Sequence, residues 1–407
     1  MKWLIVEDAL RDNHGHWIEY ISTFKKGLLD AGDSVEILCD EKAEPWVIER
    51  FAAQAVLPES IWHRIGDGAG KLTRLFRIPI HAVKTWLTMR KWLTAHPAPD
   101  IIFVPTVLVH HLLGWYLLTT GPLRKCPTRI LLFFPNTPVN LVKGTRRGMF
   151  SDDPTARLFK WLIRRLAPAV QEGKVILGVE TIAMRNVLMD LTAAPFTYLP
   201  HPVPVFANID LAPRVLTFAA YGPGRHEKGS DLLQQAISLH LEANPKSPVR
   251  FKIQWLTDFV GADGSMISKL KTLLDAPQVE FITHYFQPGE YARRLAETDV
   301  LVLPYRIESY GLRVSRVVIE AMVHGIPIIA TAGTTLTEQA EMYGACVECS
   351  DGSIDSLLSA IQQVEENYAA LRAKAGKQAT LAIDHFSVKN FRKLLMNRLK
   401  NKMAHEL

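Results

Sequence analysis

Short apolar runs alternate along the chain with longer stretches in which apolar residues recur at helical spacing. The start of the chain shows this order once. Residues 2–6 and 33–38 read as strands, and Ile18, Ile21 and Leu28 lie between them at helical spacing. A strand, a helix and a second strand in this order predict a βαβ unit.

The same alternation continues through most of the chain, although residues 42–98 are predicted to be helical and irregular. Successive strand and helix segments of this kind predict doubly wound parallel sheets, so the expected fold class is α/β. Further strands are predicted at residues 101–104, 129–134, 175–179, 215–219, 251–256, 279–282, 300–303 and 328–330.

A proline-rich segment interrupts the alternation, with five prolines within the nineteen residues 195–213. Such a segment is extended and stiff, and it marks a domain boundary. A chain of 407 residues is long enough for two domains. We therefore expect one Rossmann-like domain over residues 1–198, a linker over 199–214, a second domain over 215–385, and a C-terminal helix over 386–407 that returns to the first domain.

Composition narrows the class of protein. With 48% hydrophobic and 22% charged residues, the chain is expected to be globular. Its four cysteines are scattered, which suits a reducing compartment. Cys346 and Cys349 form a C-x-x-C pair, but nothing nearby completes a zinc site, so we interpret them as ordinary strand residues.

Two segments bear on localisation. The start, MKWLIVED, lacks a small-residue cleavage site and is interpreted as a strand, so a cytoplasmic protein is expected. Residues 101–123 carry no charge. We interpret them as a buried strand and a buried helix, with a membrane span as the alternative.

A basic region lies in the first domain. Residues 68–151 contain twelve Lys or Arg and one acidic residue, Asp100, and Trp86 and Trp92 lie among the basic positions. A basic amphipathic segment with aromatic residues suits an anionic membrane surface, here the inner face of the cell membrane. The alternative is a solvated helix face. Nucleic acid is not expected as a partner, because no recognition module is present.

A glycine-rich loop follows the predicted strand 215–219. Residues 221–229 read YGPGRHEKG and place Arg225 and Lys228 three residues apart. Glycines such as Gly224 free the backbone, and two such cations can bind one diphosphate. Solvated surface cations are the alternative interpretation.

A second candidate stretch runs over residues 305–327, YRIESYGLRVSRVVIEAMVHGIP. It follows a predicted buried strand, and Val314, Val318 and Met322 recur in it at helical spacing. The carboxyl end of a parallel strand and the start of the next helix bind anionic ligands. Glu308 and Glu320 lie in this stretch, and carboxylates accept hydrogen bonds from sugar hydroxyls. The combination indicates a sugar-nucleotide site.

These two stretches together resemble the retaining glycosyltransferases with two Rossmann-like domains facing each other across a cleft (the GT-B fold), in particular family 4. The resemblance rests on G-R-x-x-K-G-x-D-x-L from Gly224, then Leu-Pro-Tyr, Glu-Ser-Tyr-Gly-Leu and Ile-Glu-Ala-Met-x-x-Gly-Ile-Pro. It covers most of the chain, is strongest over residues 215–345, and is weak in the first domain.

The resemblance implies roles for individual residues. Arg225 and Lys228 would bind the donor diphosphate and act in catalysis, and Glu320 would hold the ribose. Glu308 would bind the transferred sugar and is the third catalytic candidate. The second domain would bind the nucleotide-sugar, and the first domain the acceptor. Gly15 would lie against the diphosphate, on the opposite side of the cleft. The remaining donor-site candidates are Gly224, Ser309, Tyr310, Gly311, Leu312 and Arg313.

The chain departs from the family pattern at the glutamates. Eleven residues separate Glu308 from Glu320, whereas the family usually has seven, and Leu312 stands eight positions before Glu320. Either Glu308 reaches the site on a longer loop, or other groups replace it. The inserted turn brings Arg313, which would add a cation at the phosphates.

A second departure concerns a histidine that the family often has in the first domain. Here the corresponding loop is Pro135-Asn136-Thr137, and Asn136 cannot take up a proton. His16, His110 and His111 are the candidates to replace it as acceptor or sugar contacts.

The function expected from the sequence is transfer of a hexose, with retention, from a UDP- or GDP-linked donor to a glycan or lipid-linked acceptor. No cofactor and no metal are expected, because Arg225 and Lys228 can supply the positive charge that a bound cation supplies elsewhere. The alternatives are a nucleotide-sugar epimerase on the same fold and a non-catalytic sugar-nucleotide-binding protein.

Overall fold

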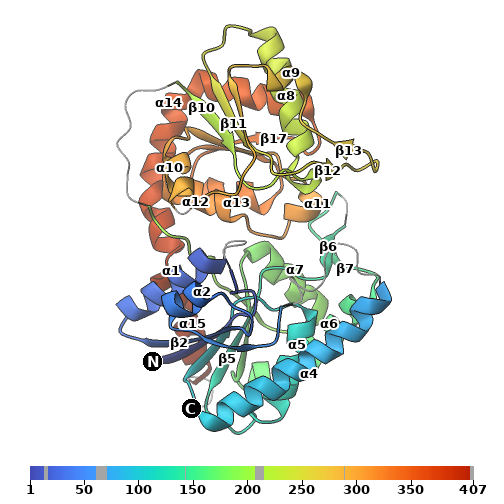
Figure 1. The fold of residues 1–407 in the computed structure, drawn as a ribbon, viewed down its shortest axis with the longest axis vertical. Coiled ribbons are helices and arrows are strands. Elements are labelled where there is room, and N and C mark those ends of the chain that lie inside the picture. The colour runs from blue at the N-terminus through green and yellow to red at the C-terminus, as the bar shows by residue number, and fades with distance from the viewer. Residues whose placement is uncertain (13–16, 61–70, 143, 207–214, 288, 404–407) are drawn as a thin grey trace. The chain divides into compact units, whose positions relative to one another are not determined.

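A computed structural model describes residues 1–407 except 13–16, 61–70, 143, 207–214, 288 and 404–407. The contacts between residues divide the chain into two compact units. The N-terminal unit comprises residues 1–202 and 387–407, and the C-terminal unit comprises residues 203–386 (Figure 1). The boundary at Pro202 lies inside the segment that we predicted as a linker.

The N-terminal unit is built on a seven-stranded parallel sheet of order β3-β2-β1-β4-β5-β8-β9. In the middle of the sheet, β4 is fully apolar and all four of its residues are buried. The strands are β1 Lys2–Val6, β2 Ser34–Asp40, β3 Gln54–Leu57, β4 Ile101–Val104, β5 Arg129–Phe134, β8 Val175–Val179 and β9 Phe196–Tyr198. A separate antiparallel pair is formed by β6 Val139–Leu141 and β7 Gly148–Phe150.

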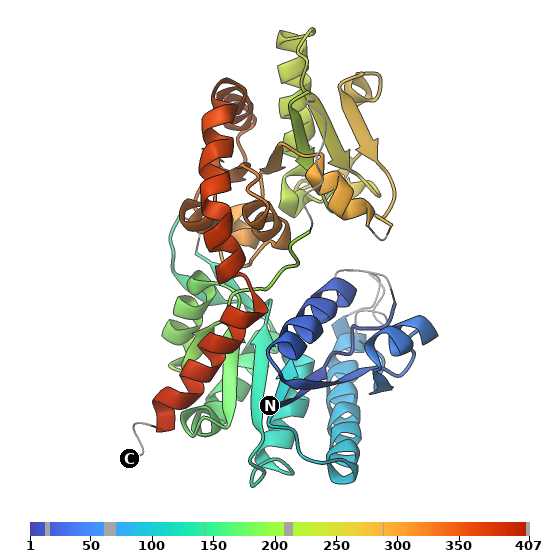
Figure 2. The same ribbon diagram turned by 90° about the vertical axis from the view of Figure 1, so that its left-hand side faces the viewer.

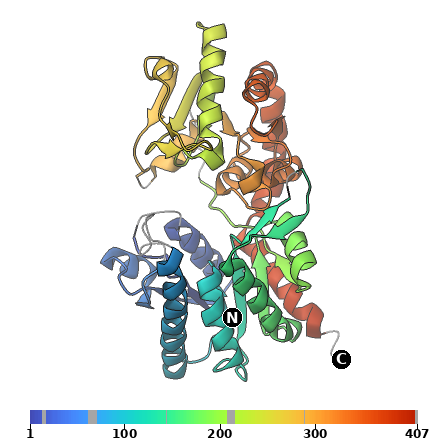
Figure 3. The same ribbon diagram turned by 90° about the vertical axis from the view of Figure 1, so that its right-hand side faces the viewer.

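The helices of this unit cover the sheet. Helices α4, α5 and α6 pack side by side, as Figure 3 shows. The helices are α1 Trp17–Asp30, α2 Pro45–Phe51, α4 Lys71–Ala95, α5 Val109–Thr120, α6 Pro154–Gln171, α7 Ile182–Thr192 and α15 Val388–Met403. Residues 101–123 form strand β4 and helix α5, as interpreted from the sequence, and within the described ranges no helix meets the length and apolarity that a membrane crossing needs.

Helix α15, the last of the chain, packs into the N-terminal unit (Figure 2). The Phe391 ring lies 4.9 Å from that of Phe24 on α1 and 5.7 Å from that of Phe103 on β4. Arg392 forms two hydrogen bonds to the buried Asp33 carboxylate, of 2.6 and 3.0 Å. Apolar packing and a charge-assisted pair therefore hold the C-terminal helix on this sheet.

The C-terminal unit contains a six-stranded parallel sheet of order β14-β11-β10-β15-β16-β17. Its strands are β10 Thr217–Ala220, β11 Arg250–Gln254, β14 Val279–Ile282, β15 Val300–Leu303, β16 Ile328–Thr331 and β17 Cys346–Cys349. Cys346 and Cys349 are thus strand residues with free thiols, as interpreted from the sequence. A short antiparallel pair, β12 Phe259–Val260 and β13 Met266–Ile267, stands apart from the sheet.

Both faces of this sheet are buried. Alternate residues of β15 show why: Val300 and Val302 belong to one apolar core, and Leu301 and Leu303 belong to the other. A strand covered on both faces is an apolar run without polar alternation, which is how it was recognised in the sequence. The covering helices are α8 Ser230–Ala243, α9 Lys271–Leu274, α10 Glu290–Ala296, α11 Ile307–Tyr310, α12 Arg316–Val323, α13 Thr335–Tyr343 and α14 Ile354–His385, with a 3-10 turn, η1, at His226–Lys228.

The predicted fold class is confirmed, with two α/β units that each carry a parallel sheet. The sequence missed short elements, among them β3 within the region predicted as helical and irregular, and the hairpin β6–β7. These segments are too short to show a period, and tertiary pairing decides their structure.

Candidate active site

The candidate site lies where the strand order of the C-terminal sheet reverses. Strand β10 pairs with β11 on one side and with β15 on the other, and the chain runs outward from β10 in both directions. In open α/β sheets, ligands bind beyond the carboxyl ends of the two strands at such a switch point. The loop 221–229 leaves β10 here, and the stretch 304–311 leaves β15. The two stretches singled out in the sequence are therefore neighbours.

Two glycines allow these stretches to approach each other. Gly229 has φ +63°, and a Cβ atom on it would lie 2.1 Å from the carbonyl oxygen of Pro304. Gly222 has φ +94°, and a Cβ atom on it would lie 2.3 Å from Nζ of Lys228. Both positions have a left-handed backbone that favours glycine. At Gly229 a side chain would also meet a backbone oxygen, whereas at Gly222 it would displace the end of the Lys228 side chain. Lys228 consequently points its ammonium group back at the start of its own loop.

The two predicted cations differ in their surroundings. Nζ of Lys228 lies 5.9 Å from the centre of the Tyr305 ring. Burial, together with Arg225, lowers the pKa of Lys228 to about 8. Arg225 is exposed, and its Nη1 lies 3.4 Å from Oε1 of Glu227. Lys228 is thus a fixed charge with few compensating anions, and Arg225 is an exposed charge that can swing toward a ligand.

Arg306 ties the two loops together and was not among the residues predicted from the sequence. Its Nη2 donates to Oδ2 of Asp231 at 2.6 Å, and its Nε donates to the carbonyl oxygen of His226 at 3.1 Å. Its backbone N–H donates to the carbonyl oxygen of Glu227 at 3.0 Å. The sequence contained a signal that could have indicated this pair. Asp231 is the last charged residue of the motif G-R-x-x-K-G-x-D, and Arg306 directly follows the motif Leu-Pro-Tyr.

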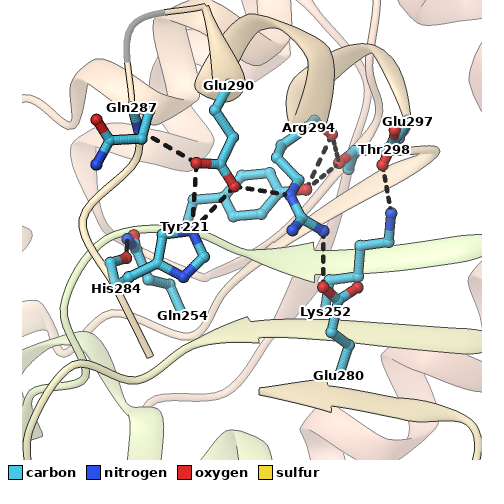
Figure 4. Close-up of polar contacts among 10 residues, drawn as sticks. All are labelled: Tyr221, Lys252, Gln254, Glu280, His284, Gln287, Glu290, Arg294, Glu297 and Thr298. Carbon is cyan, nitrogen blue, oxygen red and sulfur yellow. Dashed lines mark hydrogen bonds and ion pairs between the residues drawn. The ribbon is translucent and has the colours of Figure 1, made fainter. Parts of the chain in front are cut away.

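A network of polar side chains lies behind the glycine-rich loop (Figure 4). The side chain of Gln254, at the end of β11, accepts from the N–H of Gly222 at 2.7 Å and donates to the carbonyl oxygen of His284 at 3.0 Å. Nε2 of His284 lies 3.0 Å from a Glu290 carboxylate oxygen, and Arg294 lies 3.4 Å from that same oxygen. The carboxyl ends of three neighbouring strands are thus joined by side chains.

Glu320 is buried on α12 with both carboxylate oxygens engaged. Nε of Arg316 donates to Oε1 at 2.7 Å, and the hydroxyl of Tyr291 donates to Oε2. Burial and the Glu320 carboxylate raise the pKa of Tyr291 well above its usual range. A carboxylate offers about four acceptor positions, so ribose hydroxyls could still bind it after these two bonds. Arg316 and Tyr291 are partners that sequence reasoning did not assign.

The candidate residues 308–311 lie in a turn whose backbone N–H groups bond to carbonyl groups of the same turn. The amides of Ser309 and Tyr310 donate to the carbonyl oxygen of Arg306, and the amide of Gly311 donates to that of Ile307. These three amides are therefore committed within α11 and are not directed at a ligand. Glu308 is exposed on α11, and Leu312, which stands at the family's usual glutamate position, is buried. Arg313 is half-buried beside Leu312.

The candidates of the N-terminal unit are dispersed. Gly15 and His16 lie outside the described residues. Asn136 is exposed and its Oδ1 accepts from the N–H of Thr137 at 2.9 Å. His110 and His111 are 5% and 4% exposed and lie in the interior, which leaves little surface for an acceptor or a sugar to contact.

Comparison with known proteins agrees with this geometry. Residues 209–381 match the family described as glycosyl transferases group 1. The fold is similar to that of sucrose-phosphate synthase from Thermosynechococcus elongatus, with a TM-score of 0.64, 16% identity and 100% of each chain covered. The HepE protein of Anabaena in complex with UDP and glucose gives a TM-score of 0.60 at 13% identity, covering 98% of this chain and 99% of that one. The lipopolysaccharide outer core galactosyltransferase WaaB gives 0.61 at 14% identity, covering 99% and 100%. Among curated proteins, no sequence match to the chain is found.

The switch-point arrangement and these matches define a glycosyltransferase with the GT-B fold. The match to glycosyl transferases group 1, over residues 209–381, lies within the C-terminal unit, residues 203–386. The fold and the class of enzyme that the sequence motifs indicated are both confirmed.

Proposed function

We propose that the protein transfers a hexose, with retention of anomeric configuration, from a UDP- or GDP-linked donor to a glycan or lipid-linked acceptor. The observation that carries the proposal is the position of Lys228, half-buried against the glycine-rich loop at the switch point of the C-terminal sheet. The family match over residues 209–381 supports glycosyl transfer. Retention is what the resemblance to family 4 implies.

The proposed chemistry uses charge at the leaving group. As the bond between the sugar and the diphosphate breaks, negative charge grows on the β-phosphate. Lys228 is already fixed in place, and Arg225 is free to close on the same oxygens, so both stabilise that charge. Glu320 would accept hydrogen bonds from the ribose hydroxyls. Glu308 remains our candidate for the transferred sugar, since it is exposed on α11.

The test of the donor site is the binding of UDP and GDP to single variants. Arg225→Ala and Lys228→Ala should each lower the affinity measured by calorimetry by about tenfold to a hundredfold, the loss of one charge-assisted contact. Lys246→Ala is the matched control. Lys246 is exposed in the loop before β11, at the amino ends of the strands, whereas the candidate site lies at their carboxyl ends. Unchanged affinity in both site variants would refute the assignment.

The donor itself can be identified by thermal shift. A ligand that binds only the folded protein raises its melting temperature, and the rise grows with the logarithm of the ratio of ligand concentration to Kd. We expect UDP-hexoses to give the largest shift, since the similar Anabaena structure holds UDP and glucose. Adding Mg²⁺ should not change the shift, because Arg225 and Lys228 supply the positive charge. A donor that stabilises only with Mg²⁺ present would refute the metal-free mechanism.

We propose further that the N-terminal unit binds an anionic membrane from the cytoplasmic side, where a lipid-linked acceptor would lie. Ile80, Val83 and Leu87 form an exposed apolar stripe on α4, at 52%, 45% and 51% exposure. Lys84, Arg90 and Lys91 are exposed along the same helix. Apolar side chains flanked by cations suit insertion among anionic headgroups.

Liposome flotation tests the membrane proposal. Binding should require anionic lipid and fall with salt. Ile80→Ser with Leu87→Ser should reduce flotation, whereas Leu381→Ser should not, since Leu381 is equally exposed at 56% but lies on α14. Equal loss in the control, or no flotation of the unaltered protein at low salt, would refute this proposal.

A further inference from the structure

Four buried side chains with metal-binding groups converge in the N-terminal unit. Asp8 follows strand β1, His81 lies on α4, and His110 and His111 lie on α5. One ligand atom from each of the four lies within 4.8 Å of every other. These residues come from three separate segments of the chain, so no spacing in the sequence announces them. The sequence led us to expect no metal.

The cluster lies at a position where α/β sheets bind ligands. Strand β1 pairs with β2 on one side and β4 on the other, so this is the switch point of the N-terminal sheet. Asp8 stands just beyond the carboxyl end of β1. Beside it, Thr106, beyond the end of β4, donates to Oε2 of Glu7 at 2.8 Å. The loops after the two central strands are therefore joined at the base of the cluster.

Two nitrogen atoms in the cluster lack a hydrogen-bond partner. Nε2 of His81 and Nε2 of His110 are buried and have no hydrogen bond to any described residue. Both side chains are 5% exposed, so bulk water does not solvate them. Nε2 of His81 lies 3.2 Å from Oδ2 of Asp8, outside hydrogen-bond geometry. A cation between these atoms would satisfy both nitrogens and the carboxylate together.

The hydrogen bonds of the other ring nitrogens show which histidine can bind a metal ion and which one only holds another ligand in place. Nδ1 of His81 lies 3.5 Å from the hydroxyl of Thr85, which orients this ring with Nε2 toward Asp8. Nδ1 of His111 accepts from the N–H of Leu108 at 3.2 Å, so the proton of the neutral ring is on Nε2. That Nε2–H donates to Oδ2 of Asp8 at 2.8 Å. His111 thus holds the carboxylate and has no lone pair left for a metal.

We propose that Asp8, His81 and His110 bind a divalent transition-metal ion, with zinc as the first candidate, and that His111 is a positioning residue for Asp8. Imidazole nitrogen with one carboxylate suits zinc or iron(II) and disfavours Mg²⁺ or Ca²⁺, which prefer oxygen ligands. Zinc ligands lie about 2.0–2.1 Å from the ion. The three groups are close enough to reach that distance by small side-chain movements.

A fourth ligand has room beside the cluster. A cavity of about 20 Å³ is lined by Asp8, Thr85, Thr106 and His111, among other residues. A space of this size holds roughly one water molecule. The site would therefore complete a four-coordinate shell with water and link the β1 loop to helices α4 and α5.

The first test uses the unaltered protein and does not depend on any variant. Protein purified without chelator should contain about one zinc or iron ion per chain by elemental mass spectrometry, which also distinguishes the two metals. After the metal is removed, Co²⁺ should restore binding and give the visible absorption of a low-symmetry site, and Zn²⁺ should raise the melting temperature. Absence of metal at purification together with no Co²⁺ spectrum would overturn the proposal.

The second test distinguishes the proposed metal ligands from residues that only lie near the site. Asp8→Asn, His81→Gln and His110→Gln should each weaken zinc binding by at least about tenfold, and His111→Gln should weaken it less, because it acts through Asp8. His96→Gln is the matched control, since His96 is exposed just after α4 and stacks on Trp92. Equal zinc affinity in all five variants would refute the ligand assignment. Circular dichroism and the melting temperature of each metal-free variant show whether its N-terminal unit is folded, independently of the metal.

Discussion

Nη2 of Arg306 lies 2.6 Å from Oδ2 of Asp231, and this pair joins the loop after β15 to the first turn of α8. Arg306 also donates to the carbonyl oxygens of His226 and Glu227, the residues between Arg225 and Lys228. The two halves of the candidate donor site are thus held at a set separation by one guanidinium group, which itself has no proposed contact with the donor.

Removing this tie should loosen the site. Arg306→Ala should lower the free energy of unfolding by roughly 1–3 kcal/mol, as expected when a charge-assisted hydrogen bond with partly buried partners is lost. Affinity for UDP should fall as well, because the carbonyl oxygen of His226, within the 225–228 turn, loses its side-chain donor, although the backbone N–H of residue 306 still bonds to Glu227. Chemical denaturation and calorimetry measure the two effects.

Arg157→Ala is the control for the Arg306 variant. Arg157 pairs with Asp152 at 2.9 Å, but their side chains are 78% and 91% exposed. An exposed pair of this kind contributes little, so the change in unfolding free energy should stay below about 1 kcal/mol. If Arg306→Ala changes the free energy of unfolding as little as Arg157→Ala does, Arg306 does not hold the two loops together.

Donor binding should depend on pH through Lys228. Burial and Arg225 lower its pKa to about 8, whereas a bound diphosphate favours the protonated form and raises the pKa again. Below about pH 8 the amine is already charged, so affinity is insensitive to its titration. Above that pH binding must take up a proton, and affinity for UDP should fall by up to about tenfold per pH unit.

Lys228→Arg provides the comparison for the pH profile. Arginine stays protonated throughout this range, so the variant should show a flat affinity between about pH 7 and about pH 9 if Lys228 is responsible. Calorimetry in buffers of different ionisation enthalpy should also detect the proton taken up by the unaltered protein. A slope that survives in the variant would assign the titration to another group.

Two glycines with similar backbones should respond differently to alanine. Gly229 and Gly264 have φ +63° and +83°, but only at Gly229 would the added Cβ atom meet another group, the Pro304 carbonyl oxygen. Gly264→Ala should cost about 1–2 kcal/mol from the left-handed backbone alone. Gly229→Ala should cost about 1–3 kcal/mol more, since the loops must move apart, and should weaken UDP binding. Equal stabilities would mean that the loops separate freely.

Glu320 should contribute to stability as well as to the proposed ribose contact. Glu320→Ala leaves the Arg316 guanidinium and the Tyr291 hydroxyl without their acceptor in a buried site. The expected loss is roughly 3 kcal/mol in the free energy of unfolding. Glu320→Gln keeps an acceptor oxygen and should cost less.

Binding measurements on the folded Glu320 variants separate the two roles. If the carboxylate binds ribose, Glu320→Gln should weaken UDP more than it weakens inorganic diphosphate, which has no ribose. Comparable weakening of both ligands would assign Glu320 a purely structural role.

Local patterns in the sequence were sufficient for much of this protein. The buried strands β10 and β15 are apolar runs because both of their faces are covered. Their burial can therefore be predicted from their residue types alone. The cations Arg225 and Lys228 and the glycines beside them follow β10 within a few residues. Such short-range relations can be recognised without any knowledge of packing. They indicated the fold and a sugar-nucleotide site, and the family resemblance that they carry implied the class of enzyme.

Relations between distant segments were decided by the tertiary structure. The family resemblance placed Glu308 in the donor site and backbone amides near Tyr310–Leu312 at the phosphate. The amides of Tyr310 and Gly311 instead bond within their own turn. The link from Arg306 to Asp231 spans 75 positions, and the bond from His111 to Asp8 spans 103. No periodicity connects residues so far apart.

The sequence by itself therefore determined most of the strands and helices, with short elements such as β3 and the hairpin β6–β7 excepted. It also determined that a cationic glycine-rich loop follows a buried strand. The order of strands in each sheet decided which of those segments meet. In the C-terminal unit it brought Gly229 against Pro304. In the N-terminal unit it gathered Asp8 and three histidines from three segments into one buried cluster. The physical reason is that strand pairing and helix packing are selected by the burial of whole apolar faces, so polar residues carried on those elements are brought together as a consequence.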